Sequence, residues 1–239
     1  MGSEMCIRDR YYELSEIMER ENKDMIVNML YVRSSLERAN ESRREMEAVN
    51  VKLLKQSETD QMTGLANRYR LNAYSEKVLD YCYEHRLPLA MEILDIDFFK
   101  QYNDNYGHQQ GDECIIAIAN ELKKMEDGQT FCARYGGDEF IIIYAGISAE
   151  EVHAKAGALR QNIMNLKLEH LYSKALPIVT ISQGISYGVP EEGNRSWDFL
   201  HTADMLLYQV KKRSRNDICI ADIRGQELDL SSKQEKVEP

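Results

Sequence analysis

The stretch ARYGGDEFIIIY, residues 133–144, joins two apolar segments through two glycines and two acids. Gly136 and Gly137 can form the tight turn of a β-hairpin, because glycine adopts positive φ angles without steric cost and leaves space above the turn for a bulky ligand. Asp138 and Glu139 follow at the start of the second predicted strand. The stretch therefore predicts a hairpin with two carboxylates near its tip. A solvated turn whose acids only promote solubility is the alternative.

Strands and helices are expected to alternate around this hairpin. The spacing of apolar residues predicts helices at 68–85, 111–125, 149–168 and 197–212, and strands at 89–94, 130–135, 140–144, 178–187 and 218–221. Such alternation is typical of an α/β sandwich with one central sheet. We therefore expect one α/β domain over residues 58–224.

The region before this domain predicts one long helix over 11–57. It lacks glycine and is rich in the good helix formers Glu, Arg, Met and Leu. An apolar residue occupies every seventh position from Tyr11 to Leu53, which is the repeat of a supercoiled helix. This repeat favours a dimerising coiled coil, and the alternative is a helix packed against its own or another domain. Residues 1–10 open with Met-Gly-Ser, typical of a cloning remnant, and the polar residues 225–239 are expected to be disordered.

The composition narrows the partners of the chain. A net charge of −10 among 239 residues argues against a general binder of nucleic acid or anionic membranes, which needs a basic surface. A ligand with phosphates must therefore be bound locally, by a metal ion or a small basic cluster. The five cysteines lack metal-binding spacing, and no segment predicts a membrane span or a signal peptide. We expect a cytoplasmic protein with reduced thiols.

Two further acids, Asp95 and Asp97, follow the predicted strand 89–94. We expect them to point to opposite sides of the sheet, so that only one of them joins Asp138 and Glu139. A strand-end carboxylate facing hairpin acids suits Mg²⁺, which binds few carboxylates and leaves room for substrate phosphates. Two such ions could activate a hydroxyl for in-line displacement at phosphorus. The alternative is a set of acids that serves edge protection or solubility.

Five motifs occur in order between residues 60 and 216: DQMTGLANR (60–68), DIDFFKQYNDNYGHQQGDE (95–113), RYGGDEF (134–140), TISQGIS (180–186) and ADMLLYQVKKRSRN (203–216). In composition and separation they resemble the GGDEF family of diguanylate cyclases, over about residues 60–221. The resemblance implies a palm-like, ferredoxin-like central sheet, mainly antiparallel and flanked by helices, as in nucleotide cyclases. It also implies condensation of two GTP molecules into cyclic di-GMP and two pyrophosphates, a nucleotidyltransferase reaction.

The resemblance assigns metal ligands by position. Asp95 and Asp138, with the carbonyl of Ile96, would hold Mg²⁺ or Mn²⁺, with two ions expected in each site. Glu139 would bind the second ion or help to deprotonate the attacking 3′-hydroxyl. These roles are what the resemblance implies for this chain.

The resemblance also assigns phosphate-binding groups. The backbone amides of Phe98, Phe99 and Lys100, at a helix start, would hold the β- and γ-phosphates. Lys211 and Arg215 are four residues apart, share one face if that segment is helical, and would reach the same phosphates. The alternative for these basic residues is a solvated helix end that complements the helix dipole.

Asn103 and Asp112 fall at the base-reading positions of the family. An ionised Asp112 can only accept hydrogen bonds, and guanine offers N–H donors along one edge where adenine presents an acceptor. His108 is a weaker candidate for a substrate contact. The alternatives are a turn or helix-end residue for Asn103 and a helix N-cap for Asp112.

The chain departs from the family at three places. Asp127 and Thr130 occupy the positions of the Arg and the Asp in the family's product-inhibition motif. An acid in place of arginine should repel cyclic di-GMP, so feedback through that site is expected to be absent. Ser214 replaces a glycine and would loosen the approach of Arg215 if that position needed a positive φ. Gln183 is unusually polar for a central strand.

The product joins two GTP molecules, and each site is expected to hold one. Two domains must therefore face each other, so we expect catalysis to require a homodimer that the helix 11–57 brings together. An upstream sensory domain or regulator is also expected, in a bacterial protein whose full-length parent could be tethered to a membrane. Three alternatives remain: a domain that binds GTP and signals without turnover, a polymerase-type palm, and a purely structural coiled-coil partner.

Overall fold

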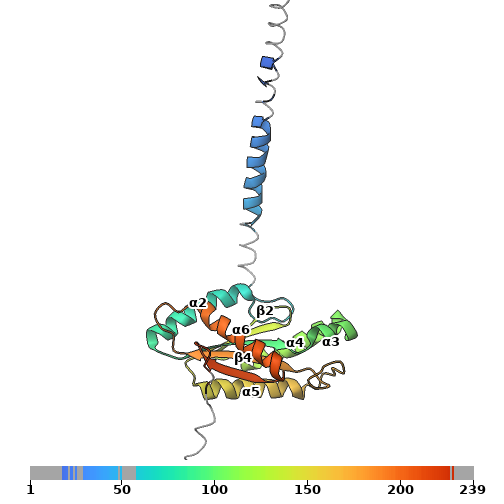
Figure 1. The fold of residues 1–239 in the computed structure, drawn as a ribbon, viewed down its shortest axis with the longest axis vertical. Helices are drawn as coiled ribbons and strands as arrows, with labels where there is room; N and C mark the ends of the chain where they lie inside the picture. The colour runs from blue at the N-terminus through green and yellow to red at the C-terminus, as the bar shows by residue number, and fades with distance from the viewer. Residues whose placement is uncertain are drawn as a thin grey trace, which may run out of the picture. The chain divides into compact units, whose positions relative to one another are not determined.

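The computed structural model describes residues 18–20, 22–23, 25, 29–47 and 49 in the N-terminal unit of the chain, and residues 58–226 and 228 in the C-terminal unit. In the first unit, residues 29–47 form a continuous helix (Figure 1). Apolar side chains at the predicted repeat positions, such as Val32 and Met46, are exposed along it. The helix prediction is confirmed over this segment, and its pairing with a second chain remains a prediction. Residues 1–10 and 229–239 lie outside the described residues.

The second unit is built on a five-stranded sheet with the order β2-β3-β1-β4-β5. The strands are β1 (Leu89–Ile96), β2 (Thr130–Gly136), β3 (Glu139–Ala145), β4 (Ile181–Gly188) and β5 (Ile218–Asp222). Neighbouring strands are antiparallel from β2 to β4, and β5 runs parallel to β4. The predicted, mainly antiparallel sheet is confirmed, and β1 lies at its centre.

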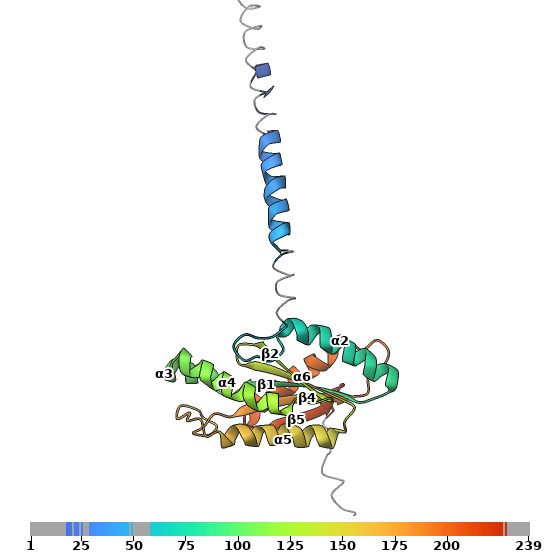
Figure 2. The same ribbon diagram turned by 180° about the vertical axis from the view of Figure 1, so that it is seen from behind.

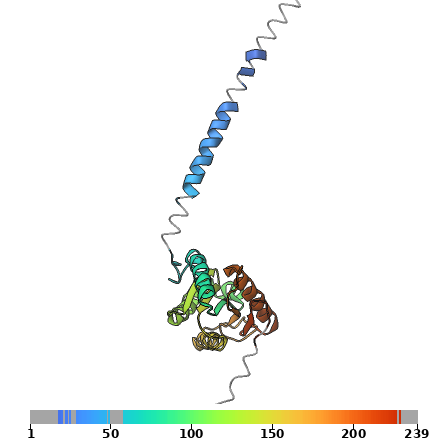
Figure 3. The ribbon, with the colours of Figure 1, turned by 90° about the vertical axis from the view of Figure 1, so that its left-hand side faces the viewer.

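Helices cover both faces of the sheet (Figures 2 and 3). The helices are α2 (Arg68–His85), α3 (Phe99–Tyr106), α4 (His108–Met125), α5 (Ala149–Asn165) and α6 (Ser196–Arg213). Alternate residues of β1 supply the two buried clusters, since Ala90 and Leu94 pack with α4 and α5, whereas Leu89 and Met91 pack with α2. α6 crosses β1 and β4 on the α2 face. The result is the predicted α/β sandwich.

Three element boundaries differ from the predicted ones by three residues. α4 begins three residues before the predicted start, and α3 precedes it as a separate helix that apolar spacing did not indicate. α5 ends at Asn165, because Lys167 adopts a positive φ of 52° that stops the helix. β4 begins at Ile181, because the amide of Val179 bonds to Leu168 in the preceding loop.

Two smaller predictions concern the thiols and the tail. Cys82, Cys114, Cys132 and Cys219 are buried thiols that form no disulfide, which agrees with the expected structural role of reduced cysteines. The amide of Leu228 donates to the Ile220 carbonyl. The first part of the predicted tail therefore runs along β5 instead of leaving the domain at once.

Candidate active site

The candidate catalytic acids meet where β1 ends beside the β2–β3 hairpin. The register of β1 and β3 pairs Asp95 with Glu139, and residues directly opposite in antiparallel strands point to the same face. Asp138 immediately precedes Glu139 in the hairpin turn. The backbone therefore brings together the three acids that the sequence analysis combined.

The electrostatics of these acids reflect their close approach. Burial raises the pKa of the Asp95 carboxyl to about 6, Lys211 opposes the rise, and the negative charges of Asp138 and Glu139 add to it. Burial also raises the pKa of Glu139, again against the effect of Lys211. The ammonium of Lys211, on α6, lies 2.7 Å from Asp95 Oδ2. The cluster thus holds more negative charge than this lysine balances.

The donor set suits a divalent cation. Asp95, Asp138 and Glu139 offer the hard oxygen ligands that Mg²⁺ prefers, and a cation would relieve the repulsion that adds to the raised pKa values of Asp95 and Glu139. Ile96 ends β1 next to them and offers a backbone carbonyl. Among the residues that the structure describes, no group of three or more Asp, Glu, His or Cys side chains is already arranged around one metal position. The residues present fit Mg²⁺ or Mn²⁺, and the number of ions remains a prediction.

Asp97 does not join the hairpin acids, but the reason given by the sequence analysis is wrong. The two strand-end acids are two residues apart, so they would share a face if the strand continued. The strand ends at Ile96, and the buried Asp97 instead accepts hydrogen bonds from the hydroxyls of Thr180 and Ser182 at 2.8 and 2.6 Å. It also accepts the Asn216 amide at 2.9 Å. Asp97 therefore ties the end of β1 to β4 and to the segment after α6.

The hairpin turn lies one residue later than predicted. Gly136 pairs with Glu139 as the last residue of β2, so Gly137 and Asp138 form the two-residue turn. The ladder shifts register between Arg134 and Gly136, and this bulge adds a residue to β2. Gly137 has a φ of +53°, which glycine adopts freely. The turn therefore carries one of the two predicted catalytic acids.

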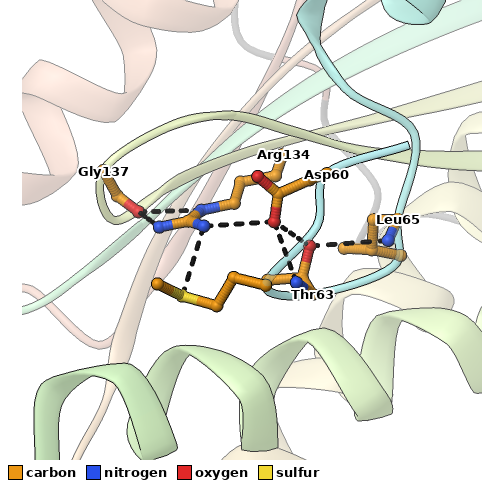
Figure 4. A network of polar contacts seen from close by, with 6 residues as sticks. Asp60, Thr63, Leu65, Arg134 and Gly137 are labelled. Carbon is orange, nitrogen blue, oxygen red and sulfur yellow. Dashed lines mark hydrogen bonds and ion pairs between the residues drawn. The ribbon is translucent and has the colours of Figure 1, made fainter. Parts of the chain in front are cut away.

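An arginine network holds this turn (Figure 4). Arg134 Nε and Nη2 donate to the Gly137 carbonyl at 3.1 and 2.8 Å, and Nη1 donates to Asp60 Oδ1 at 3.1 Å. Thr63 donates its amide and its hydroxyl to the same Asp60 oxygen at 2.9 and 2.6 Å. Against the effect of burial, these bonds lower the pKa of Asp60. The network connects the start of the domain to the hairpin, which the sequence analysis did not predict although both ends lie in quoted motifs.

α3 begins where the substrate phosphates were predicted to bind. Phe98 is its N-cap residue, and no side chain caps the first turn. The first amides of a helix have no partner within it, so those of Phe98, Phe99 and Lys100 are free of a capping side chain. The first turn also contains no acidic residue. This helix start is therefore suited to an anion.

The two predicted phosphate-binding cations, Lys211 and Arg215, do not share a helix face, because the segment is not helical as far as Arg215. α6 ends at Arg213, and Arg215 adopts a φ of +54° beyond it. The guanidinium of Arg215 lies 4.2 Å from the centroid of the Phe98 ring. The helix stops there because Asp97 binds the Asn216 amide. Arg215 therefore contacts the start of α3 from the segment that follows α6, not from the helix itself.

The predicted base-reading residues lie on two adjacent helices. Asn103 is on α3, and its Oδ1 is buried without a hydrogen-bond partner in the described part of the chain. Gly111 leaves room for this oxygen, since a Cβ at that position would lie 1.8 Å from it. Asp112 and His108 are exposed on α4, and the N-cap of α4 is Gly107. The N-cap alternative for Asp112 is therefore wrong, and base reading by Asn103 remains a prediction.

The structure accounts for two of the departures from the family. Ser214 has a φ of −131°, so that position does not need glycine and the expected loosening of Arg215 has no basis there. Gln183 is buried and donates through Nε2 to the buried Glu92 Oε1 at 2.7 Å. Its polarity is thus explained by a partner on the neighbouring strand.

The third departure from the family, at Asp127 and Thr130, places both side chains beside a lysine of the same domain. Lys155 of α5 donates to Asp127 Oδ2 at 2.8 Å and to Thr130 Oγ1 at 3.1 Å. The hydrogen bond from Lys155 lowers the pKa of Asp127 to about 2. Both side chains already have a cationic partner, which agrees with the prediction that no product-binding site is formed there but does not test it.

A cavity of about 300 Å³ adjoins the catalytic acids and was not predicted. Its lining includes Glu139, Tyr135, Trp197, His201 and Asp204. Trp197 is exposed and stacks on His201 with ring centroids 4.7 Å apart. The charge of Asp204 also contributes to the raised pKa of Glu139. A lone tryptophan in a helical segment has no pattern that would have predicted this position.

Residues 57–217 match the family model described as "Diguanylate cyclase, GGDEF domain". The chain belongs to the GGDEF family. This GGDEF chain is 35% identical over 163 residues to the probable diguanylate cyclase DgcC of Escherichia coli K12, an alignment that covers 67% of this chain and 42% of DgcC. It is 33% identical over 190 residues to diguanylate cyclase DgcP of Pseudomonas aeruginosa, covering 78% of this chain and 28% of DgcP. The GGDEF chain thus spans less than half the length of these two relatives.

Solved structures show the same fold. The coiled coil and GGDEF domain of DgcB from Caulobacter crescentus, in complex with c-di-GMP, is 28% identical, with a TM-score of 0.63 over 77% of this chain and 97% of that one. The active GGEEF domain of a diguanylate cyclase from Vibrio cholerae is 30% identical, with a TM-score of 0.56 over 65% and 97%. Within its described residues, this GGDEF chain contains no helix that is both long and apolar enough to cross a membrane.

Proposed function

We propose that this GGDEF chain is a diguanylate cyclase, which condenses two GTP molecules into cyclic di-GMP and two pyrophosphates. The observation that carries the proposal is the cross-strand pair of Asp95 and Glu139, with Asp138 beside it in the turn. In addition to burial, the charges of Asp138 and Glu139 raise the pKa of Asp95, and the charge of Asp138 raises that of Glu139, as expected of a site that binds divalent cations. The relatives named as diguanylate cyclases support the same reaction.

The three acids would have different roles in catalysis. Asp95 and Asp138, with the Ile96 carbonyl, would hold Mg²⁺ or Mn²⁺. Two ions are expected in each site. When bound, the metal supplies charge that lowers the pKa of the attacking 3′-hydroxyl and stabilises the displacement at phosphorus. Glu139, whose pKa is raised by burial, would bind the second ion or help to take the proton of that hydroxyl. Lys211 would turn from Asp95 toward the phosphates as substrate enters.

The triphosphate would lie at the start of α3. The amides of Phe98, Phe99 and Lys100 would bind its terminal phosphates, aided by the positive end of the helix dipole. Arg215 lies beside this helix start, over the Phe98 ring. With the α3 amides and Arg215 at one place, an acidic chain would bind a polyanion without a broad basic surface.

The guanine base would lie between α3 and α4. The unpaired Oδ1 of Asn103 and the carboxylate of Asp112 are acceptors that match the N–H donors of guanine. His108 is retained as a weaker contact. A Cβ at Gly136 or at Gly137 would meet nothing within 4 Å, so the space above the hairpin is open to substrate.

Catalysis would require two chains, each holding one GTP. The helix of the N-terminal unit exposes Met25, Met29, Val32 and Leu36 along an apolar groove that also includes Arg33, Glu37 and Asn40, and a second copy of the helix would cover these apolar side chains. Such pairing raises the local concentration of the two active sites. We further propose that the chain works in the bacterial cytoplasm under an upstream sensory domain or regulator.

Incubation of the purified chain with GTP and Mg²⁺, followed by chromatography of the nucleotides, tests the proposal. We expect cyclic di-GMP and pyrophosphate, and neither product from Asp138→Asn, which keeps the side-chain shape and removes a charge. GTP binding without product would instead favour a GTP-binding signalling module. Since Ser214 does not disturb the backbone and the acids are in place, turnover is the expected outcome.

A further inference from the structure

The loop between α5 and β4 folds over the junction of β1 and α3. The amide of Val179 donates to the Leu168 carbonyl at 2.8 Å, and the amide of His170 donates to the Pro177 carbonyl at 3.0 Å. Thr180, at the end of this loop, donates its hydroxyl to Asp97. The loop is therefore closed on itself and anchored to the end of β1, where it holds His170 in a fixed place.

His170 is wholly buried and contacts the start of α3. Its Nε2 lies 3.2 Å from the Phe98 carbonyl oxygen. A carbonyl can only accept, so Nε2 carries the proton. Nδ1 is buried with no partner among the described residues, and burial lowers the pKa of the ring. The ring packs edge-on against Tyr102 at 5.2 Å, so His170 is a neutral donor aimed at one backbone oxygen.

Phe98 has a backbone conformation that needs support. Its φ of 57° and ψ of 30° are left-handed, which an L-residue with a bulky side chain rarely adopts. Its carbonyl accepts the first helical bond, from the Tyr102 amide at 3.0 Å, in addition to the bond from His170. Arg215 covers its ring. The direction of the following amides depends on this residue, because α3 begins immediately after it.

We propose that His170 is a positioning residue, which holds Phe98 in the left-handed conformation and so directs the amides of residues 98–100 toward the terminal phosphates of the nucleotide. The inference rests on the proposed binding of GTP. His170 is too deeply buried to touch substrate, and it acts through the Phe98 carbonyl. Its loss should weaken recognition of the phosphates and leave recognition of the base unchanged.

The test compares affinities for GMP and for a non-hydrolysable GTP analogue, measured by calorimetry with Mg²⁺. His170→Phe keeps a ring and removes the donor, and we expect about a tenfold loss of affinity for the triphosphate, the effect of one hydrogen bond. Affinity for GMP, which lacks the β- and γ-phosphates, should not change. His170→Gln places an amide donor near the position of Nε2 and should recover most of the lost affinity. Equal losses for both nucleotides, or no recovery in His170→Gln, would overturn the proposal.

A matched control disturbs the same loop without touching Phe98. The Tyr106 hydroxyl accepts the Leu171 amide at 3.0 Å, and Tyr106→Phe removes this bond. We expect wild-type affinity for both nucleotides in this variant. A selective loss of triphosphate affinity here would show that general loosening of the loop is responsible and would contradict a specific role of His170.

Hydrogen exchange without nucleotide separates this inference from the proposed function. In His170→Phe, the amide of Tyr102, which donates to the Phe98 carbonyl, should exchange at least tenfold faster than in the original chain, whereas the strands should exchange equally. Exchange at the original rate would overturn the inference even if GTP binds. Failure of the original chain to bind the GTP analogue would overturn the proposed function and leave the exchange result as the test of His170.

Discussion

Gly111 leaves the space that the Asn103 carbonyl oxygen occupies. An alanine Cβ would lie 1.8 Å from that oxygen, so Gly111→Ala must turn the Asn103 side chain away. Because the Asn103 amide has to turn away and Phe99 Cζ, 3.3 Å from the added carbon, has to shift slightly, we expect the unfolding free energy to change by about 1 kcal/mol. Affinity for a GTP analogue, measured by calorimetry, should fall about tenfold. In the control Gly157→Ala, a Cβ meets nothing within 4 Å, and affinity should be unchanged. Equal affinity in both variants would place the base elsewhere.

Glu92 makes the stability of the domain depend on pH. Burial raises the pKa of its carboxyl from 4.5 to about 7, although hydrogen bonds from Gln183 and Tyr144 oppose the rise. The folded state binds the Glu92 proton more tightly than the unfolded state does. The protonated carboxyl therefore contributes fully to stability below pH 4.5, and this contribution is lost as the pH rises through about 7.

The variant Glu92→Gln should remove this dependence. We expect its unfolding free energy, relative to the original chain, to increase by on the order of 2 kcal/mol between pH 5 and pH 8. Urea denaturation at a series of pH values measures the difference. A constant difference between the two proteins across this range would mean that Glu92 does not titrate there.

At the scale of residues, sequence spacing located the acids but not their partners. Asp138 and Glu139 adjoin one turn, and Asp95 ends a strand, so local pattern was enough to group them. Lys155 and His170 gave no such signal, because each acts through a contact with a segment far away in the sequence. The same holds for Glu92, whose partners come from two other strands.

Among the elements, the hairpin depends on the segment that begins the domain. Arg134 joins the Gly137 carbonyl to Asp60, so Arg134→Gln should loosen the turn that carries Asp138. We expect turnover to fall about tenfold, because the variant loses the charge-assisted hydrogen bonds to the Gly137 carbonyl, with GTP-analogue affinity changed far less. Initial rates of pyrophosphate release, beside calorimetry, measure the two effects.

The control for this prediction is Arg70→Gln. Arg70 lies 3.9 Å from Glu58 in an exposed pair near the same segment and does not contact the hairpin turn through any described hydrogen bond. Exposed pairs of this kind contribute little, so turnover should stay within about twofold. Similar losses in both variants would show that the hairpin is not the element affected.

Element types followed from apolar spacing, whereas their ends followed from tertiary contacts. The hairpin turn moved by one residue because β2 contains a bulge that pairing with β3 creates. α6 ends before Arg215, because Asp97, more than a hundred residues earlier in the sequence, accepts a hydrogen bond from the Asn216 amide. Neither interaction can be recognised from the residues near the boundary itself.

For the whole molecule, the account requires two chains. Val32→Glu places a charge in the apolar groove of the N-terminal helix, so it should oppose pairing. We expect the rate of product formation at low protein concentration to fall at least tenfold, with affinity for a GTP analogue unchanged. Ser34→Glu, two positions away and so on another side of the helix, should have little effect. Equal rates for both variants at every concentration would contradict a role of this helix in catalysis.

The central claim is that Asp95, Asp138 and Glu139 form a metal-dependent nucleotide site. The most direct measurement is a crystal structure of the chain with Mn²⁺ and a non-hydrolysable GTP analogue, with the metal located by its anomalous scattering. We expect the metal about 2.1 Å from carboxylate oxygens of Asp95 and Asp138, with the triphosphate at the start of α3. Nucleotide bound elsewhere, or metal that leaves these carboxylates without contact, would contradict it.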